Sequence, residues 1–458
     1  MNRITPLRRF FHGGALEHGV SRAAPVPDAG MLPRECDVVV IGGGFIGCFT
    51  ALALAERGLR VTLCEKGVIA GEASGRSIGW IDSQYLSPRK MELIDCSKRL
   101  WERMDERIGA STGYRRCGLL SLFKSPDDAD AARQWLASVQ GLPGVDAYLV
   151  DAREAASLLP AGADTRHGGL YQPSDACAEP TLAAPAVALA AGRLGANVLQ
   201  HCAVRGIECQ AGRVSAVHTE RGRIAAQAVV LAGGAWSPLL ARRLGLPLPQ
   251  LMAFGSAQRI RPAVAGPDTS AWLAQGIYRA NGDGSYTVGA VNGAAPLTPT
   301  TLRHLWQMLP AIRQMWSQVD PVFSLDTFLH DLKHLRGWPL DGPSPFERCR
   351  ILQPETRHGV LRETLGQLQA HYPLFADARV EETWAGALVS TPDNMPVISG
   401  VERMPGLFLG TGFYYGLTMG PAAGQALADL VSGRTPEFDV HPYRHERFVD
   451  GSALQFQA

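Results

Sequence analysis

One glycine-rich turn near the start of the chain constrains the fold more than any other feature. Residues 36–41 (CDVVVI) are apolar and mostly β-branched, which predicts a short buried strand. Residues 42–47 (GGGFIG) follow directly and place glycines at the first, third and sixth positions. Helix-forming residues occupy 48–57, and a second apolar stretch, 59–64, ends at Glu65. The order strand, glycine turn, helix, strand predicts a βαβ unit within an α/β fold.

Each glycine of this turn has its own physical task. Gly42 permits the tight turn from strand to helix, Gly44 lets a pyrophosphate approach the backbone, and Gly47 lets the helix pack closely on the strand. The first helical turn adds unpaired N–H groups and a partial positive charge. Glu65 lies 18 residues after Gly47, where a carboxylate can bind both hydroxyls of a ribose and repel a 2′-phosphate. We therefore predict a dinucleotide site that disfavours NADP, and a glycine turn without a ligand is the weaker alternative.

Three later segments indicate which dinucleotide is bound. Residues 71–80 form a small polar loop, residues 228–237 predict a strand entering a glycine turn, and residues 406–430 predict a strand, a glycine turn and a helix. With the first motif, these segments resemble the D-amino-acid oxidase family of FAD-dependent oxidoreductases over about residues 34–433. That family includes glycine oxidase, sarcosine oxidase, D-amino-acid dehydrogenase and γ-glutamylputrescine oxidase. The resemblance implies an α/β fold in which a glutathione-reductase-type FAD-binding Rossmann domain is interleaved with a mixed-sheet substrate domain.

The resemblance also implies that the chain crosses between the two domains several times. Residues 335–354, which are rich in Arg, Pro and aromatic side chains, depart from the family pattern. A cap over the site, an oligomer contact and a long surface loop all remain open for this segment. The expected division is an N-terminal arm at 1–33, an FAD-binding domain at 34–90, 178–245 and 380–435, a substrate domain at 91–177 and 246–379, and a C-terminal tail at 436–458.

Matched position by position, the resemblance implies which residues contact FAD. The helix that follows Thr418 would direct its positive end at the N1–C2=O edge of the flavin, which stabilises the reduced cofactor. Some relatives attach the flavin to a cysteine near a C-terminal Pro-Asp motif, but no cysteine follows Cys349 here, so we expect non-covalent FAD. The implied contacts are Gly42, Gly44, Phe45, Ile46 and Gly47 at the pyrophosphate, Glu65 and Lys66 at the adenosine ribose, Ser74, Arg76, Ser77, Gly79 and Trp80 along the pyrophosphate and flavin, Val204, Gly233 and Trp236 around the adenine half, and Gly412, Tyr414, Gly416, Leu417 and Thr418 at the isoalloxazine ring.

The substrate residues are harder to assign than the cofactor residues. Flavin chemistry needs a donor C–H bond held over N5 rather than a nucleophile or a metal, and the sequence has no motif for either. A substrate carboxylate favours a guanidinium partner, and Arg279 resembles the position where related enzymes place one. A surface arginine before a hairpin turn explains Arg279 equally well. Tyr278 and Tyr414, with Arg279, complete the expected catalytic set, as hydrogen-bond donors or as cavity walls.

Composition narrows the classes of partner. The chain has 44 Lys and Arg against 43 Asp and Glu, so neither nucleic acid nor an anionic membrane is favoured. No apolar run is long enough for a bilayer, and nine cysteines without a CxxC pair favour a reducing, cytoplasmic setting. We expect oxidation of an amino acid or secondary amine to an imine, with reoxidation of FAD by O₂ or a quinone-type acceptor. Oxidation of a 2-hydroxy acid, or a role as the flavin-holding subunit of a larger dehydrogenase, remain alternatives, and the oligomeric state is open.

Overall fold

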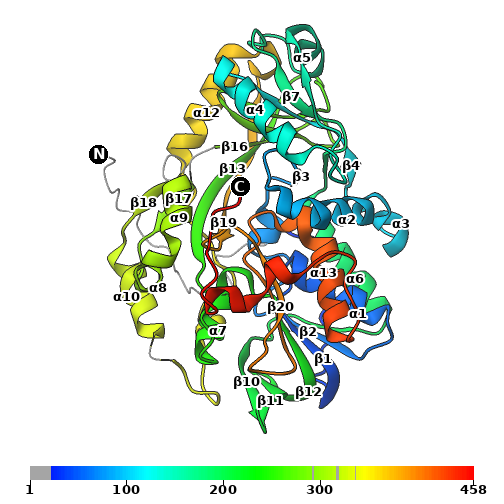
Figure 1. Ribbon diagram of the computed structural model, residues 1–458, viewed down its shortest axis with the longest axis vertical. Coiled ribbons are helices and arrows are strands. Elements are labelled where there is room, and N and C mark those ends of the chain that lie inside the picture. The colour runs from blue at the N-terminus through cyan, green and yellow to red at the C-terminus, as the bar shows by residue number, and fades with distance from the viewer. Residues whose placement is uncertain (1–21, 291–292, 316–318, 336) are drawn as a thin grey trace.

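Two large sheets organise the chain, and they meet near the middle of the molecule (Figure 1). The computed structural model describes residues 22–290, 293–315, 319–335 and 337–458, so most of the expected N-terminal arm lies outside the described residues. Residues 22–33 pack on the first sheet: Val26 is buried, and the Ala29 amide donates to the Val198 carbonyl oxygen at 2.9 Å. Among the described residues, no helix is both long and apolar enough to cross a membrane.

The first sheet has a parallel core of five strands, which confirms the predicted Rossmann-type architecture. These strands come from distant parts of the chain and are held by in-register pairing, as where Val39 lies opposite Val229. In spatial order they are β9 (Asn197–Leu199), β2 (Val61–Cys64), β1 (Glu35–Ile41), β12 (Gly222–Leu231) and β21 (Leu407–Thr411), with β10 (Val204–Gln210) and β11 (Arg213–Thr219) as an antiparallel extension and β20 (Val397–Gly400) beside β21.

Helices α1 (Phe45–Ala55), α6 (Pro180–Arg193), α13 (Gly416–Val431) and α2 (Met91–Glu102) form a layer beside this sheet (Figure 1). Helix α1 is central, because it packs against both α6 and α13, and α2 packs on α13. Every residue of α1 is buried, as its uniformly apolar sequence requires. The opposite face of the sheet packs against α7 (Ser237–Arg243) and Trp338.

Two of these helices contain an internal proline, and each leaves a carbonyl without its usual N–H partner. In α6, Pro185 cannot bond to the Thr181 carbonyl oxygen, which instead accepts from the Ala24 amide at 2.8 Å. In α13, Pro421 leaves the Leu417 carbonyl oxygen, which accepts from the Trp101 indole at 3.0 Å. In each helix, a donor from a distant segment therefore satisfies the carbonyl oxygen that the proline leaves unpaired.

The second sheet has ten strands and is mostly antiparallel, with parallel pairs β14–β5 and β17–β18. Its longest strands, β13 and β19, pair along their whole length at the centre of the molecule (Figure 1). The strands are β5 (Leu119–Leu122), β6 (Tyr148–Val150), β7 (Gly169–Gln172), β13 (Leu251–Arg261), β14 (Ser270–Leu273), β15 (Gly276–Ala280), β16 (Tyr286–Gly289), β17 (Gly293–Pro296), β18 (Val319–Val322) and β19 (Arg379–Ser390).

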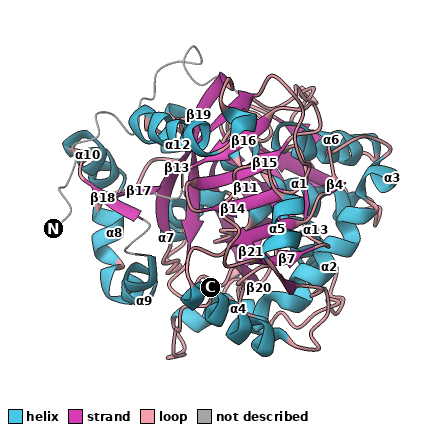
Figure 2. Cartoon of the chain, turned by 90° about the horizontal axis from the view of Figure 1, so that it is seen from above, coloured by secondary structure: helices cyan, strands magenta, loops and turns pink. Residues whose placement is uncertain are grey.

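Most of the remaining helices lie around the second sheet, whereas α3 packs against α2 and α6 beside the first sheet (Figure 2). Helices α8, α9 and α10 lie together beyond β17 and β18, whereas α4 and α5 lie near β7 (Figure 1). Their bounds are α3 (Met104–Ile108), α4 (Pro126–Val139), α5 (Ala152–Leu158), α8 (Pro299–Arg303), α9 (Leu305–Met315), α10 (Leu325–His334), α11 (Pro345–Arg348) and α12 (His358–His371), and a small sheet joins β3 (Trp80–Ile81), β8 (Ala176–Cys177) and β4 (Arg115–Arg116).

Two segments differ from the expected division into domains. Residues 380–435 were expected with the cofactor-binding sheet, but β19 is paired with β13 from Arg379 to Ser390 and so belongs to the second sheet. Residues 91–177 were expected in the substrate domain, yet α2 packs on α13 beside the first sheet. Both differences arise from long-range pairing of apolar surfaces that local sequence does not specify.

Replacement of Gly47 tests the close packing of α1 on β1. A Cβ atom at Gly47 would overlap the Gly42 carbonyl oxygen, so Gly47→Ala should lower the free energy of unfolding by about 1–3 kcal/mol. Gly192 in α6 is the matched control, because a Cβ there meets no atom within 4 Å, and Gly192→Ala should be neutral or stabilising by up to about 1 kcal/mol. Thermal denaturation measures both variants, and equal melting temperatures would contradict this account of the packing.

Candidate active site

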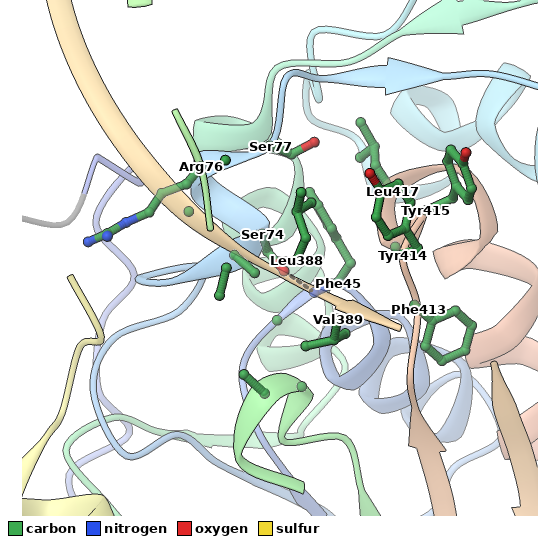
Figure 3. A pocket seen from close by; sticks show the side chains of 18 of the residues that line it. Phe45, Ser74, Arg76, Ser77, Leu388, Val389, Phe413, Tyr414, Tyr415 and Leu417 are labelled. Carbon is green, nitrogen blue, oxygen red and sulfur yellow. Dashed lines mark hydrogen bonds between the residues drawn. The ribbon is translucent and has the colours of Figure 1, made fainter. Parts of the chain in front are cut away.

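A cavity of about 810 Å³ lies between the carboxyl ends of the parallel strands and the second sheet. The turn after β1, the loop at 70–78, the turn after β12 and the turn after β21 line its first-sheet side. Residues 386–389 of β19, together with small residues of β13, form the opposite wall. Ligands of open α/β sheets bind at this edge, where the strand order changes direction. Figure 3 shows side chains from these distant segments facing one space.

The glycine turn presents free backbone donors to the cavity. Helix α1 begins at Phe45, and no acidic side chain occupies its first turn. The Phe45 amide donates to Ser74 Oγ at 3.0 Å, whereas the amides of Gly44 and Ile46 have no hydrogen-bond partner among the described residues. A Cβ at Gly44 would lie 2.9 Å from Ser74 Oγ, so a side chain there would displace the hydroxyl that the Phe45 amide binds. Free amides at a helix N-terminus are suited to a phosphate group.

Glu65 is fixed at the end of β2 by the same turn. Its Oε2 accepts from the Gly43 amide and its Oε1 from the Gly67 amide, both at 2.7 Å. Burial raises the pKa of the Glu65 carboxyl, while Lys66 and the two amide bonds oppose that rise. The carboxyl lines the cavity and keeps acceptor capacity for ribose hydroxyls.

Residues 337–354 approach the end of the cavity near Glu65, and Phe346 is the member of this segment that lines it. Lys66 Nζ bonds to Glu72 at 2.6 Å and to the Cys349 and Arg350 carbonyl oxygens at 2.8 Å, so its ammonium holds this segment in place. Phe346 lines the cavity and packs edge-on against Trp236, with ring centroids 5.9 Å apart. Phe346 thus covers one end of the cavity, as a cap would.

The other end of the cavity is formed by the turn between β21 and α13. Tyr414 and Tyr415 pack edge-on with centroids 4.9 Å apart, and Leu417 lies beside them (Figure 3). Helix α13 begins at Gly416 and has no acidic residue in its first turn, so a second positive helix end faces the cavity. Thr418 in that turn hydrogen-bonds to the buried carboxyl of Asp82, a residue that the motifs did not identify.

The chain matches a family model described as "FAD dependent oxidoreductase" over residues 37–430. The chain belongs to this family. FAD is accordingly its cofactor, and the two helix ends and Glu65 lie where a long dinucleotide would need them. Of the residues that the structure describes, no group of three or more His, Cys, Asp and Glu is arranged to hold a metal ion.

Several family members of known structure or activity are similar over almost the whole chain. L-amino acid deaminase from Proteus myxofaciens, solved with anthranilate, is 33% identical over 93% of this chain and 97% of its own, with a TM-score of 0.89. Glycine oxidase from Pseudomonas putida is 29% identical over 89% of this chain and 98% of its own. The beta subunit of sarcosine oxidase from an Arthrobacter species is 28% identical over 92% of this chain and 93% of its own. The chain spans only 42% of human mitochondrial sarcosine dehydrogenase, to which it is 27% identical.

The structure brings most of the predicted cofactor residues to one cavity. Arg76 is among them, but its guanidinium bonds to the Leu352 and Ala385 carbonyl oxygens and points away from Tyr414 (Figure 3). Gly47 and Gly79 do not line the cavity: Gly47 lets α1 pack on β1, and Gly79 leaves room for the Arg279 guanidinium. The lining residues are Gly42, Gly44, Phe45, Ile46, Glu65, Lys66, Ser74, Arg76, Ser77, Trp80, Val204, Gly233, Trp236, Gly412, Tyr414, Gly416, Leu417 and Thr418.

Arg279 and Tyr278 are not among the residues that line the cavity. The Arg279 side chain, 4% exposed, forms an ion pair with Glu179 at 2.9 Å and donates to the Ala178 carbonyl oxygen. Tyr278 points to the other face of β15, where it packs against Tyr286 and Phe375. The expected contact of Arg279 with a substrate carboxylate is therefore replaced by a contact with a carboxylate of the protein itself.

Arg279→Ala should destabilise the protein rather than weaken substrate binding. The change leaves the Glu179 carboxylate with the Thr181 hydroxyl at 2.9 Å and the more distant Arg259 at 3.6 Å, and should cost about 2–4 kcal/mol of unfolding free energy. Arg166→Ala is the control, because that exposed side chain should change stability by less than about 0.5 kcal/mol. Denaturant unfolding measures both variants. Unchanged stability together with a large rise in KM for carboxylate substrates would restore the catalytic role of Arg279.

Proposed function

We propose that the chain oxidises an α-amino acid or an N-alkyl amino acid to an imine, which hydrolyses to a keto or aldehyde product. FAD supplies the hydride acceptor for this step. The observation that carries the proposal is one continuous cavity with a phosphate-binding turn at one end, a second helix N-terminus at the other, and an apolar sheet wall opposite. Similarity to an L-amino acid deaminase along 93% of the chain supports an amino acid as substrate.

The chain's own residues would hold FAD without a covalent bond. The free amides of Gly44 and Ile46 would bind the pyrophosphate, and the Glu65 carboxyl would accept from the ribose. The ring would lie between residues 386–389 of β19 and the turn at 412–418. Cys64 is the one cysteine in the cavity lining, and it lies at the ribose end beside Glu65, away from the ring.

The remaining part of the cavity suits an apolar substrate side chain. Trp272 and Ile277 from the second sheet, and Tyr85, Leu122 and Phe123 from the β5 side, line it. Trp272 packs against Trp80 with centroids 5.4 Å apart, which continues the wall toward the expected ring position. A mostly apolar wall excludes water from the reacting C–H bond and favours bulky aliphatic or aromatic amino acids.

Anaerobic reduction of the purified holoprotein tests the proposal. L-amino acids with bulky apolar side chains should bleach the flavin band at about 450 nm. D-amino acids, N-methyl amino acids, polyamines and 2-hydroxy acids complete the panel, and a matched L and D pair gives the stereochemistry. Product analysis should find a keto acid and ammonia. Bleaching by 2-hydroxy acids alone would contradict amine oxidation.

One alternative function has an observation in its favour. Similarity to the beta subunit of sarcosine oxidase covers most of both chains, which supports a role as the flavin-holding subunit of a complex. A flavin-holding subunit would bind FAD, yet no amine would bleach it in isolation. Reoxidation by O₂ or by a soluble quinone then identifies the acceptor.

All nine cysteines are free, which supports our proposal of a cytoplasmic setting.

Lys124 is our candidate for the substrate carboxylate. Lys124 is an exposed residue that lines the cavity, and its ammonium has no hydrogen-bond or ion-pair partner among the described residues. The Lys66 ammonium and the Arg76 guanidinium are both bonded to the protein. Lys124→Met should raise KM for amino acids about tenfold, without changing FAD content or the KM of an amine that lacks the carboxylate. Arg116→Met, an exposed cation outside the lining, is the control. An equal rise in KM for both classes of substrate would show that Lys124 does not bind the carboxylate.

A further inference from the structure

Asp82 is a buried carboxyl at the expected ring end of the cavity. It follows β3, is 8% exposed, and is one of the residues that line the cavity. Its Oδ1 accepts from the Thr418 hydroxyl at 3.1 Å, and its amide approaches the same hydroxyl oxygen at 3.2 Å. Thr418 thereby fixes the side chain of Asp82 at the first turn of α13.

The second oxygen of Asp82 receives no hydrogen bond from the described residues. Oδ2 is not among the fully buried atoms that lack a partner, and Asp82 lines the cavity, so this oxygen is available to a ligand there. Asp175, the neighbouring buried carboxyl, shows the contrast. It accepts from Lys98 at 2.6 Å, from the Ser83 hydroxyl at 2.8 Å and from the Ser83 amide at 3.3 Å. A purely structural carboxyl here would be expected to be as fully bonded as Asp175 is.

Burial and the neighbouring charges bring the pKa of the Asp82 carboxyl close to neutral pH. Burial and the Asp175 charge together raise the pKa of Asp82 to about 7, against the opposing effects of the Thr418 hydrogen bond and the Lys98 charge. Tyr414 and Tyr415 face it from the turn before α13, and burial raises the pKa of both phenols, so both stay neutral. Asp82 is therefore mostly ionised above about pH 7 and mostly neutral below it.

We propose that Asp82 binds the ammonium group of the substrate and accepts one proton from it before the hydride leaves. In this step one N–H bond of the ammonium breaks, its electron pair stays on nitrogen, and the proton moves to Asp82 Oδ2. The nitrogen lone pair then forms the C=N bond as the C–H bond is broken and its two electrons pass with the hydrogen to FAD. The inference rests on the proposed amine oxidation, because only an amine substrate brings a cation to this carboxyl.

Asp82→Asn tests the proposal with two readouts. In the wild-type holoprotein, the rate of anaerobic flavin reduction should rise with pH through about 7, because the carboxylate form of Asp82 is the acceptor. In Asp82→Asn the rate at pH 7 should fall about 100-fold, and the rise should move to the alkaline range where the free amine loses its proton. Unchanged FAD content and melting temperature would show that the variant is folded.

A non-oxidisable ligand pair gives the readout that does not depend on turnover. 2-Aminoisobutyrate carries an ammonium but no α-hydrogen, and isobutyrate lacks the ammonium. Perturbation of the flavin spectrum should show that wild type prefers 2-aminoisobutyrate about tenfold above pH 7, and that Asp82→Asn loses this preference. An equal preference in both proteins would overturn the proposal. If the wild-type protein prefers 2-aminoisobutyrate but no amine reduces its flavin, the proposed amine oxidation is contradicted. The binding of an ammonium group by Asp82 would then still stand.

Thr418→Val provides a second variant in case Asp82→Asn does not fold. Because the Thr418 hydrogen bond lowers the pKa of Asp82, its loss should move the pH at which flavin reduction rises to a higher value. An unchanged pH profile in a folded Thr418→Val protein would show that Asp82 does not control this step.

Discussion

The close approach of two glycine-bearing helices to one sheet edge is the constraint on which the rest of the site depends. At Gly47, α1 touches the backbone of Gly42, and any side chain would force the helix off β1. At Gly424, α13 meets α1 so closely that a Cβ would lie 2.6 Å from the Phe49 Cβ. Both helices begin at the cavity. Their packing therefore directs two positive helix ends at a single ligand.

The second sheet completes the site from the opposite side. Gly386 and Ala387 of β19 and Gly255 of β13 bring backbone and small side chains to the wall, which leaves space for a planar ring, and Leu388 and Val389 add apolar side chains beside it. Trp80 and Trp272 then continue the wall toward the substrate region. The cavity thus lies at the junction of two sheets, and segments from distant parts of the chain must converge before it exists. One of these segments is β19, which pairs with β13 in the second sheet.

The part of the site that was predictable from sequence is the part set by local geometry. Gly42, Gly44 and Glu65 follow from a strand, a turn and a helix within thirty residues, and the structure places all three at the cavity. Arg279 shows where local reasoning fails, because its partner Glu179 lies 100 residues earlier in the chain. No sequence motif identifies Asp82, and the orientation of its carboxyl depends on a hydrogen bond from Thr418, 336 residues later. Pairings at such separations are decided by tertiary packing and not by neighbouring residues.

The central claim is that two helix ends hold opposite halves of one FAD molecule. Titration calorimetry of the flavin-free protein measures this directly, with FAD, ADP and FMN as ligands. The account predicts one FAD per chain, competition by ADP for the Gly42–Gly47 turn, and much weaker binding of FMN, which lacks the adenosine that Glu65 would bind. A protein that takes up no FAD, or binds FMN as tightly as FAD, would contradict it.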